Sequence, residues 1–483
     1  MQSSLNMSTK LAYGFGQYAE GLKNAAFGVL LFFFYNQVLG VSSGLVGLAV
    51  GIALVFDAVT DPLVGSLSDN WRSRFGRRHP FLLAAAVPLA VAFYFLFNPP
   101  EGLSETGLAV WLAVFAVLTR GAMTLYHVPH LSLGAELSPH FTERTTVVAY
   151  RYFCSYLGVL TALGLAFGVY FVATEDYPVG QFNLEAYRPY AAVLSLLMVV
   201  SVLVTAFGTW HRIPHLVQPA ANEPSLGPGE TFVRMFRDLA EAVRNPSFSW
   251  LFAGLLLVFM MVGVDAALNL HMNTFYWELS AGGNFAFFVA SPIGVLIGAT
   301  FARRVNELFD KRPSIVLGTG AWAVCQIVPI VLRMLGWFPE NGTDSLLTTL
   351  TAFKFVQGLF VSQALVTFNS MIADIVDDHE LRTGRRQEGI FFAAVSFSSK
   401  ATTGIGSVVA GFALILISWP EGASVQTAAD VPADTIMWLG LLYGPIVSGF
   451  VVVCLYCYSR YGIDRARHAE IVAELEILRR SKA

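Results

Sequence analysis

Charged residues are scarce in this sequence. Asp, Glu, Lys and Arg make up 13% of its 483 residues, whereas hydrophobic residues make up 55%. In ordinary soluble domains about a quarter of the residues are charged. The apolar residues also gather in long runs, for example at 81–97 and 191–207. This composition argues against a soluble protein and indicates a protein that lies in a membrane.

Signatures of catalysis and of metal binding are also missing. Cys454 and Cys457 have the spacing of a metal or redox pair, but no second pair accompanies them, so we expect neither role. The absence of a G-x-x-x-x-G-K-S/T loop disfavours direct use of ATP. No H-E-x-x-H motif and no nucleophile elbow is present either. We therefore predict that the chain is not an enzyme.

The apolar runs predict membrane-spanning helices. We count about twelve runs of about 20 residues, the length that crosses a bilayer as a helix. In hydrocarbon a spanning segment must satisfy its backbone groups internally, and the runs lack the alternation of barrel strands. The sequence thus predicts an all-α polytopic membrane protein.

Basic residues mark one side of this predicted bundle. They gather in the loops at 70–79, 303–312 and 380–387 and in the C-terminal tail, whereas the alternate loops are acidic or neutral. The positive-inside rule then places the basic loops and both termini in the cytoplasm. An even number of helices is required for that arrangement.

An internal repeat divides the chain into two halves. Gly65 and the segment 78–80 recur 233 residues later, and the segment 132–145 recurs 238 residues later at 370–383. Two parallel six-helix repeats are the layout of major-facilitator transporters. We predict that fold, with the segments 1–210 (first half), 211–245 (cytoplasmic central loop), 246–460 (second half) and 461–483 (tail helix).

The central loop has two parts of different character. Its first part, at 214–229, is rich in proline and glycine and reads as a linker. Its second part, Glu230 to Asn245, has apolar residues along one face, which predicts an amphipathic helix on the membrane surface or on the bundle. A solvated connector is the alternative.

Ionisable residues lie inside the predicted spans, where they are costly and usually functional. Asp57 and Asp61 are one helical turn apart, so they share a face, and their repulsion calls for a Na⁺ ion or a shared proton. Thr60 and Thr124 offer hydroxyl oxygens, which suit a hard cation. These four residues are the predicted cation site, with Asp57 and Asp61 as the candidate Na⁺ ligands.

Internal charge pairing is the alternative explanation for these residues. Glu20 and Lys23 are three residues apart and can pair on one helix face. Arg120 or Lys400 could neutralise the carboxylate pair permanently. Pairing alone does not easily explain charges that are spread over six or more helices, whereas a central polar cavity does.

The basic loop after the carboxylate pair predicts a gate. Asp69 at the end of one helix, with arginines across the loop, can latch the two halves together on the cytoplasmic side. Glu136–Arg144 and Asp374–Arg382 look like related pairs at the ends of two other helices. The predicted gate residues are Asp69, Arg77, Arg78, Glu136, Arg144, Asp374 and Arg382.

Four segments closely resemble the glycoside–pentoside–hexuronide:cation symporters, a family of the major-facilitator superfamily. They are FDAVTDP (56–62), SRFGRRHP (73–80), PHLSLGAELSPHFTERT (129–145) and ADIVDDHELRTGRRQEG (373–389), and the likeness extends over nearly the whole chain. The resemblance implies substrate uptake coupled to Na⁺, Li⁺ or H⁺. It also implies a cation site at the paired acids with Thr124 and Lys400, while Thr60 replaces the family's asparagine and leaves the ion open.

The positions that bind sugar in that family differ here. The family's helix-one acid falls on Gly21, its helix-four acid on His127 and its helix-ten tryptophan on Leu365. The pocket thus has fewer acids and keeps cations, so we hypothesise an anionic glycoside such as a uronide rather than a galactoside. The predicted substrate-binding residues are Glu20, Lys23, His127, Arg151, Tyr152, Ser396 and Lys400.

Together these features predict a secondary active transporter that carries a sugar or glycoside with Na⁺ or H⁺ by alternating access. We expect a monomer in a bacterial inner membrane, with no cofactor beyond the coupling ion and no nucleic-acid partner. A carrier of a lysolipid or organic anion on the same fold is one alternative. A non-transporting membrane receptor is another.

Overall fold

Helices make up the regular structure of the described residues. The computed structural model describes residues 5–138, 141–216, 228–422 and 425–482, and eleven helical spans within them are long and apolar enough to cross a membrane. A further helix, α1 (Met7–Ala25), continues through π-helical turns to Val38 and makes a twelfth. The other spans are α2 (Ser43–Asn70), α3 (His79–Leu96), α4 (Glu105–Glu136), α5 (Phe141–Leu165), α6 (Leu184–Gly208), α8 (Pro246–His271), α9 (Ala281–Phe309), α10 (Lys311–Met334), α11 (Asp344–Thr383), α12 (Glu388–Leu416), and a last span of α13 (Ala433–Leu441), α14 (Val447–Gly449) and α15 (Val451–Ser459).

Local sequence sets where several of these helices begin and end. Ser104, Asn245 and Ser280 each accept hydrogen bonds from backbone N–H groups in the first turn of α4, α8 and α9. Gly384 ends α11 in the left-handed conformation, with φ 70°. These signals separate runs whose composition alone is uniformly apolar.

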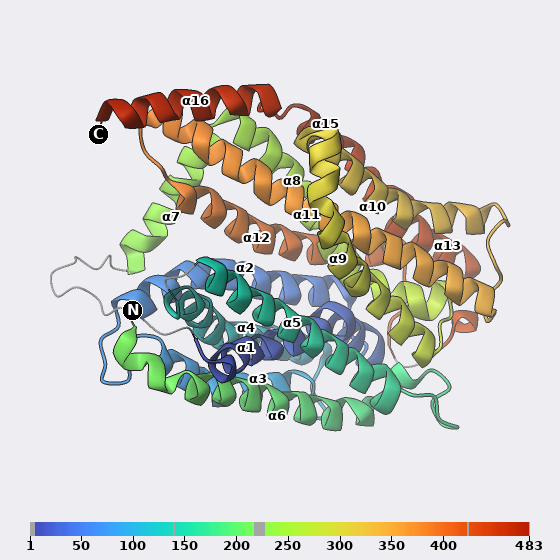
Figure 1. Ribbon diagram of the computed structural model, residues 1–483. Coiled ribbons are helices and arrows are strands. Elements are labelled where there is room, and N and C mark those ends of the chain that lie inside the picture. The colour runs from blue at the N-terminus through green and yellow to red at the C-terminus, as the bar shows by residue number, and fades with distance from the viewer. Residues whose placement is uncertain (1–4, 139–140, 217–227, 423–424, 483) are drawn as a thin grey trace.

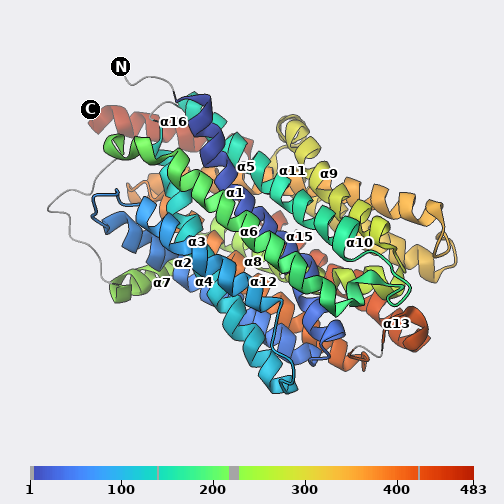
Figure 2. The same cartoon turned by 90° about the horizontal axis from the view of Figure 1, so that it is seen from below.

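The spans form two lobes of six, one of α1–α6 and one of α8–α12 together with the span α13–α15 (Figure 1). In the first half α1 packs on α5 and α6, α3 packs on α6 and α4, and α2 packs on α4. In the second half α8 packs on α12 and α15, α10 packs on α11 and α15, and α9 packs on α11. Figure 2 shows α1, α6 and α3 side by side in the first half. The predicted all-α major-facilitator fold is confirmed.

A pair of glycines repeats at the same helix crossing in each half. A Cβ atom on Gly158 of α5 would lie 3.2 Å from the Cα of Gly21 of α1. In the second half, a Cβ atom on Gly406 of α12 would lie 2.8 Å from the Cα of Gly263 of α8. Gly263 follows Gly21 by 242 residues, so α1 and α8 correspond at that offset. Small residues let membrane helices approach closely, which explains glycine at these places.

A bulky side chain at this crossing is expected to destabilise the second half. Gly406→Leu forces α8 and α12 apart, at a cost of about 1–3 kcal/mol. We expect a lower Tm for the purified protein in detergent. Gly449→Leu is the matched control, because no atom lies within 4 Å of a Cβ at that position. Equal Tm values for the two variants would contradict the proposed close packing.

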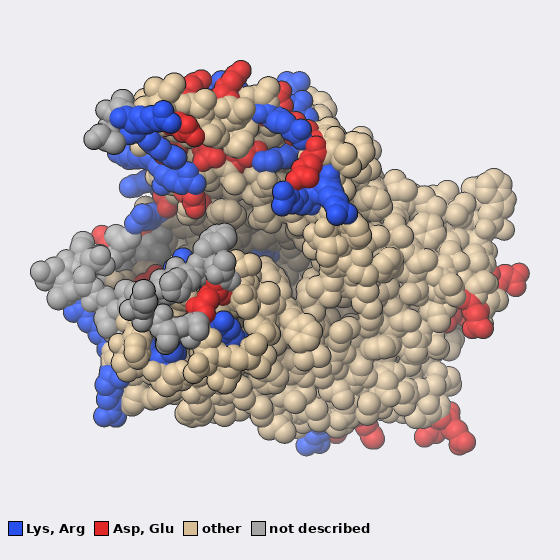
Figure 3. Space-filling view, in the orientation of Figure 1, with Lys and Arg blue, Asp and Glu red and all other residues tan. Residues whose placement is uncertain are grey.

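The two halves are joined at one end and separated at the other. At the joined end the Ser43 N–H donates to Glu421 Oε1 over 2.7 Å, and Gln181 Nε2 donates to Thr274 Oγ1 over 2.9 Å. At the other end the surface is hollowed between the halves, and most of the visible Lys and Arg side chains gather there (Figure 3). Both labelled chain ends lie at that end too (Figure 1). We call it the basic end.

Two further helices lie at the basic end. α7 (Pro228–Val243) covers most of the segment where the sequence predicts an amphipathic helix, and it packs on α12, α2 and α8, so it lies on the bundle. The predicted linker before it lies largely outside the described residues, because 217–227 are not described. α16 (Arg465–Lys482) packs on α11, with Ile471 and Leu475 buried.

Candidate functional site

The carboxylates of Asp57 and Asp61 on α2 meet at the hydroxyl of Thr124 on α4. Thr124 Oγ1 lies 2.7 Å from Asp57 Oδ1 and 3.0 Å from Asp61 Oδ1. A hydroxyl has one hydrogen to share between these two acceptors. The sequence-based grouping of these three residues therefore matches their positions. Thr60 is different, because its hydroxyl donates to the carbonyl oxygen of Phe56 in its own helix, over 3.0 Å.

Two basic side chains complete this cluster. Arg120 Nη1 on α4 lies 3.0 Å from Asp57 Oδ2, and Lys400 Nζ on α12 lies 3.1 Å from the same oxygen. Lys400 also pairs with Asp61. Two carboxylates thus face two cations, which is the arrangement that the charge-pairing alternative expects. We call Asp57, Asp61, Arg120, Thr124 and Lys400 the carboxylate cluster.

The carboxylate cluster joins the two halves of the molecule. Lys400 comes from the second half, and α12 packs on α2 of the first half. Its ion pairs with Asp57 and Asp61 therefore bridge the interface between the halves. Any ion that competes with Lys400 for these oxygens changes a contact between the halves.

Among its described residues, the second half holds no copy of this cluster. At the offsets of the repeat, Asp61 corresponds to Gly294 and Arg120 corresponds to Gly358. These two glycines face each other, since a Cβ atom on Gly358 would lie 3.0 Å from the Cα of Gly294. Within the part of the chain that the structure describes, no three Asp, Glu, His or Cys side chains gather into a metal site.

Glu20 on α1 pairs with His127 on α4. Glu20 Oε2 lies 2.8 Å from His127 Nε2, and Gln17 contacts both side chains. The sequence-based pairing of Glu20 with Lys23 is wrong, because no ion pair joins them, although Lys23 is buried on the same helix. The physical reason is that α4 contacts α1 and brings the His127 imidazole to the Glu20 carboxylate.

The remaining predicted substrate residues lie on α5 and α12. The Arg151 guanidinium lies over the ring of Tyr152, 5.1 Å from its centroid, and the Tyr152 side chain is exposed. Ser396 is exposed as well, and its carbonyl accepts a hydrogen bond from Ser399 over 2.9 Å. No described hydrogen bond or ion pair links these three to Glu20 or His127.

The predicted gate residues of the first half cluster around Glu136 at the basic end. Arg77 Nη2 and Arg78 Nη2 lie 2.7 and 2.9 Å from Glu136 Oε1, and Arg78 also pairs with Asp69. The predicted Glu136–Arg144 pair is wrong, since Arg144 donates instead to the Ser138 carbonyl. Arg77 and Arg78 belong to the loop between α2 and α3. That loop lies at the end of α4, so its arginines pair with Glu136 in place of Arg144.

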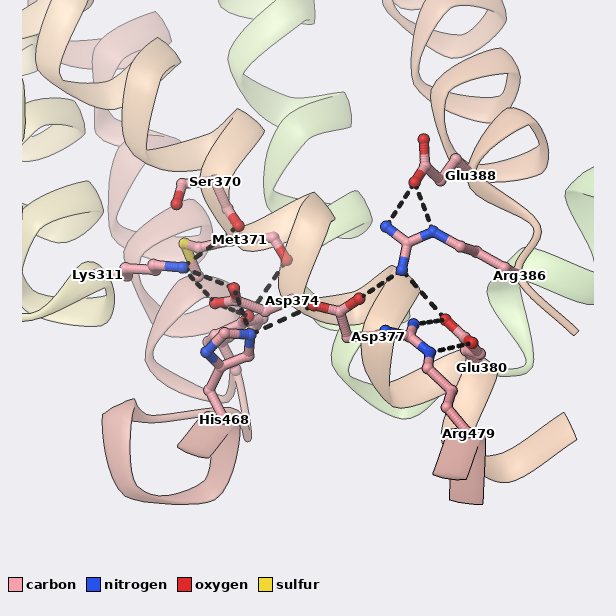
Figure 4. A network of polar contacts seen from close by, with 11 residues as sticks. Lys311, Ser370, Met371, Asp374, Asp377, Glu380, Arg386, Glu388, His468 and Arg479 are labelled. Atoms are coloured by element: carbon pink, nitrogen blue, oxygen red, sulfur yellow. Dashed lines mark hydrogen bonds and ion pairs between the residues drawn. The ribbon is translucent and has the colours of Figure 1, made fainter. Parts of the chain in front are cut away.

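The second half repeats this cluster around Asp374 (Figure 4). Lys311 Nζ lies 2.6 Å from Asp374 Oδ1, and His468 of α16 lies 3.3 Å from it. The predicted Asp374–Arg382 pair is wrong, because Arg382 pairs with Asp378 one turn away, over 2.9 Å. Both clusters stay within one half each, so neither latches the halves together in this structure.

Arg386 braces the adjoining loop in the same view (Figure 4). It pairs with Glu388 of α12 and with Asp377 and Glu380 of α11. The hydrogen bond to Glu388 is the largest of the effects that raise the pKa of its guanidinium. These ion pairs hold the loop between α11 and α12 to the ends of both helices.

One polar cluster was not assigned from the sequence. Asp265 on α8 accepts hydrogen bonds from Tyr443 Oη over 2.6 Å and from Gln326 Nε2 over 2.9 Å, and Lys354 Nζ lies 3.7 Å away. The sequence marks Asp265 and Lys354 as ionisable residues inside spans. It does not show that three other helices bring partners to Asp265.

The chain matches the family model described as MFS/sugar transport protein over residues 12–465. It is 26% identical to the putative glycoside/cation symporter YagG of Escherichia coli, covering 94% of this chain and 92% of that protein. It is 24% identical to the sodium-dependent lysophosphatidylcholine symporter 1 of Gallus gallus, covering 98% and 90%. Among solved structures, the nucleoside transporter NupG superposes with a TM-score of 0.63 at 13% identity, covering 95% of this chain and all of that one.

Proposed function

Because the chain belongs to the MFS/sugar transport protein family, we propose that it is a symporter that couples a sugar or glycoside to Na⁺ or H⁺. The family consists of transporters, so the chain is an integral membrane transport protein and not an enzyme. The glycoside/cation symporter among its relatives supports the proposed substrate class and the coupling.

The observation that carries the coupling is the bridge from Lys400 to the carboxylates of the other half. A Na⁺ ion or proton placed between Asp57 and Asp61 competes with the Lys400 ammonium for the same oxygens. The Thr124 hydroxyl, in contact with both carboxylates, can offer its oxygen to Na⁺. Cation binding then weakens a contact between the halves, which is what links an ion to a conformational change.

Charge balance supports an anionic substrate. In this structure Arg120 and Lys400 neutralise Asp57 and Asp61. A bound Na⁺ ion adds one positive charge, and releasing Lys400 leaves an ammonium without its partners. A carboxylate on the substrate, as in a uronide, restores the balance in a site that disfavours unpaired charge. The two ligands then bind better together than apart.

The polar pair of Glu20 and His127 supports recognition of sugar hydroxyls. Its carboxylate and imidazole offer an acceptor and a donor on adjacent helices, and both side chains are only partly exposed.

Alternating access then requires the joined end to open and the basic end to close. If the basic end is cytoplasmic in a bacterial inner membrane, this structure is the inward-open state of an uptake system.

Uptake into proteoliposomes tests this function. A tenfold inward cation gradient coupled one to one supports up to about tenfold accumulation, because each factor of ten is worth about 1.4 kcal/mol. We expect such accumulation for at least one member of a panel of neutral glycosides and uronides, and its loss when an ionophore collapses the gradient. Uptake that ignores every Na⁺ or H⁺ gradient would exclude symport, and binding without any uptake would favour a receptor.

A further inference from the structure

The second half contains a partly open chamber of 260 Å³ between α8, α10, α11 and α15. Its walls are almost entirely apolar and include Leu255, Phe259, Val262, Trp322, Ala364 and Leu365. The Asp265 cluster lies about one turn farther along α8 and α10. The chamber therefore lies between the Asp265 cluster and the basic end.

The same place in the first half is filled with aromatic rings. Tyr13 of α1 stacks on His130 of α4 with centroids 4.4 Å apart, and Tyr126 also stacks on His130, at 5.2 Å. Tyr13, Tyr126 and His130 are each at most 1% exposed. Buried rings thus occupy this place in the first half, where the second half has the chamber.

The repeat explains this difference residue by residue. At the offset of 238 residues, Tyr126 corresponds to Ala364 of α11. At the offset of 242 residues, Tyr13 corresponds to Leu255 of α8. Both counterparts line the chamber. Two buried phenol side chains are thus replaced by smaller apolar ones in the walls of the chamber, whereas His130 corresponds to Phe368, which also lines it.

The mouth of the chamber corresponds to the polar pair of the first half. Val262 is the counterpart of Glu20, and Leu365 is the counterpart of His127. Val262 and Leu365 are 37% and 46% exposed, and α8 and α11 make little direct contact. Parallel repeats are related by an axis along the membrane normal, so counterparts face each other across that axis. The Glu20–His127 pair therefore faces an apolar opening.

From this asymmetry we propose that the second half binds an apolar substituent of the transported molecule. Its polar head contacts the Glu20–His127 side, and its aryl or short alkyl group enters the chamber. The inference rests on the proposed transport function. A cavity of about 150 Å³ suffices for benzene, so 260 Å³ admits a phenyl or short alkyl group, such as the aglycone of an aryl glycoside.

Competition between matched glycosides tests the chamber. With wild-type protein in proteoliposomes, a phenyl glycoside is expected to compete for uptake at about tenfold lower concentration than the methyl glycoside of the same sugar, because an aromatic ring is withdrawn from water. Ala364→Phe fills the chamber and is expected to bring this ratio close to one. Val324→Phe, on an exposed part of α10, adds the same ring outside the chamber and is expected to keep the ratio.

The outcomes separate this inference from the transport function. If Ala364→Phe does not fold, Leu255→Tyr restores the ring that the first half carries and provides the same test. Equal competition by methyl and phenyl glycosides in the wild type would overturn the chamber while leaving transport intact. No cation-dependent uptake of any glycoside would overturn the function itself. Competition by lysophosphatidylcholine but not by phenyl glycosides, unaffected by Ala364→Phe, would also overturn the chamber, because the acyl chain would then bind elsewhere.

Discussion

Replacing Asp57 by asparagine is expected to reduce the initial rate of cation-driven substrate uptake about 100-fold or more. The amide preserves the shape of the side chain but removes the charge that faces Arg120 and Lys400, at 3.0 and 3.1 Å. Leaving a buried charge without its partner costs about 3–5 kcal/mol, and each 1.4 kcal/mol is a factor of ten. The incoming cation also loses one of its two carboxylates. Initial rates of uptake with and without the cation gradient measure the effect.

Two further substitutions sharpen this prediction. Asp344→Asn makes the same chemical change at an exposed residue in the first turn of α11 and is the control. Thr124→Val removes the hydroxyl between the carboxylates, whereas Thr60→Val removes one that bonds to its own helix. We expect Thr124→Val to impair cation dependence more than Thr60→Val. If Asp57→Asn accumulates substrate with unchanged ion dependence, the assignment of the cation site is wrong.

Replacing Glu136 by glutamine is expected to lower the free energy of unfolding by about 3–5 kcal/mol. One oxygen of this largely buried carboxylate accepts from Arg77 and Arg78, and the Arg78 side chain is only 3% exposed. Neutralising the carboxylate leaves two guanidinium groups close together without their shared partner. Thermal denaturation in detergent should show a Tm several degrees below that of the wild type. Glu101→Gln, in an exposed turn, is the control.

A double-mutant cycle identifies the source of this effect. Arg78→Met combined with Glu136→Leu removes the most buried guanidinium together with its carboxylate. We expect this pair of changes to cost less than the sum of the single changes, because Arg78 is then not left buried without Glu136. Additive effects, or a Tm for Glu136→Gln equal to that of the control, would show that the cluster is not a stabilising unit.

The carboxylate cluster shows which contacts a local sequence pattern can predict. The spacing of Asp57 and Asp61 predicts a shared helix face, and the structure places both side chains together at Thr124. The same reasoning offered Thr60 as a ligand, because it adjoins Asp61. Its hydroxyl bonds to the carbonyl of Phe56 instead, as threonine in an apolar helix often does.

Pairing between charged residues was predicted less well. Proximity in sequence predicts the pairs Glu20–Lys23, Glu136–Arg144 and Asp374–Arg382. Their carboxylates instead pair with His127, with Arg77 and Arg78, and with Lys311, which lie on other elements. A residue's nearest partner in a packed bundle is set by which helices cross, and sequence separation says little about that.

The sequence by itself determined that this protein spans a membrane, that it has two repeated halves, and that the candidate cation ligands Asp57, Asp61 and Thr124 lie on the second and fourth spans. These features follow from hydropathy, charge bias and local spacing, which act within one helix or one loop. Only the tertiary structure decided that Lys400 bridges the halves, that Asp265 gathers partners from three other helices, and that a chamber occupies the place of the Tyr13–His130–Tyr126 stack. Each of these depends on which faces of distant helices meet, because volume and charge are compensated between neighbours in space rather than along the chain.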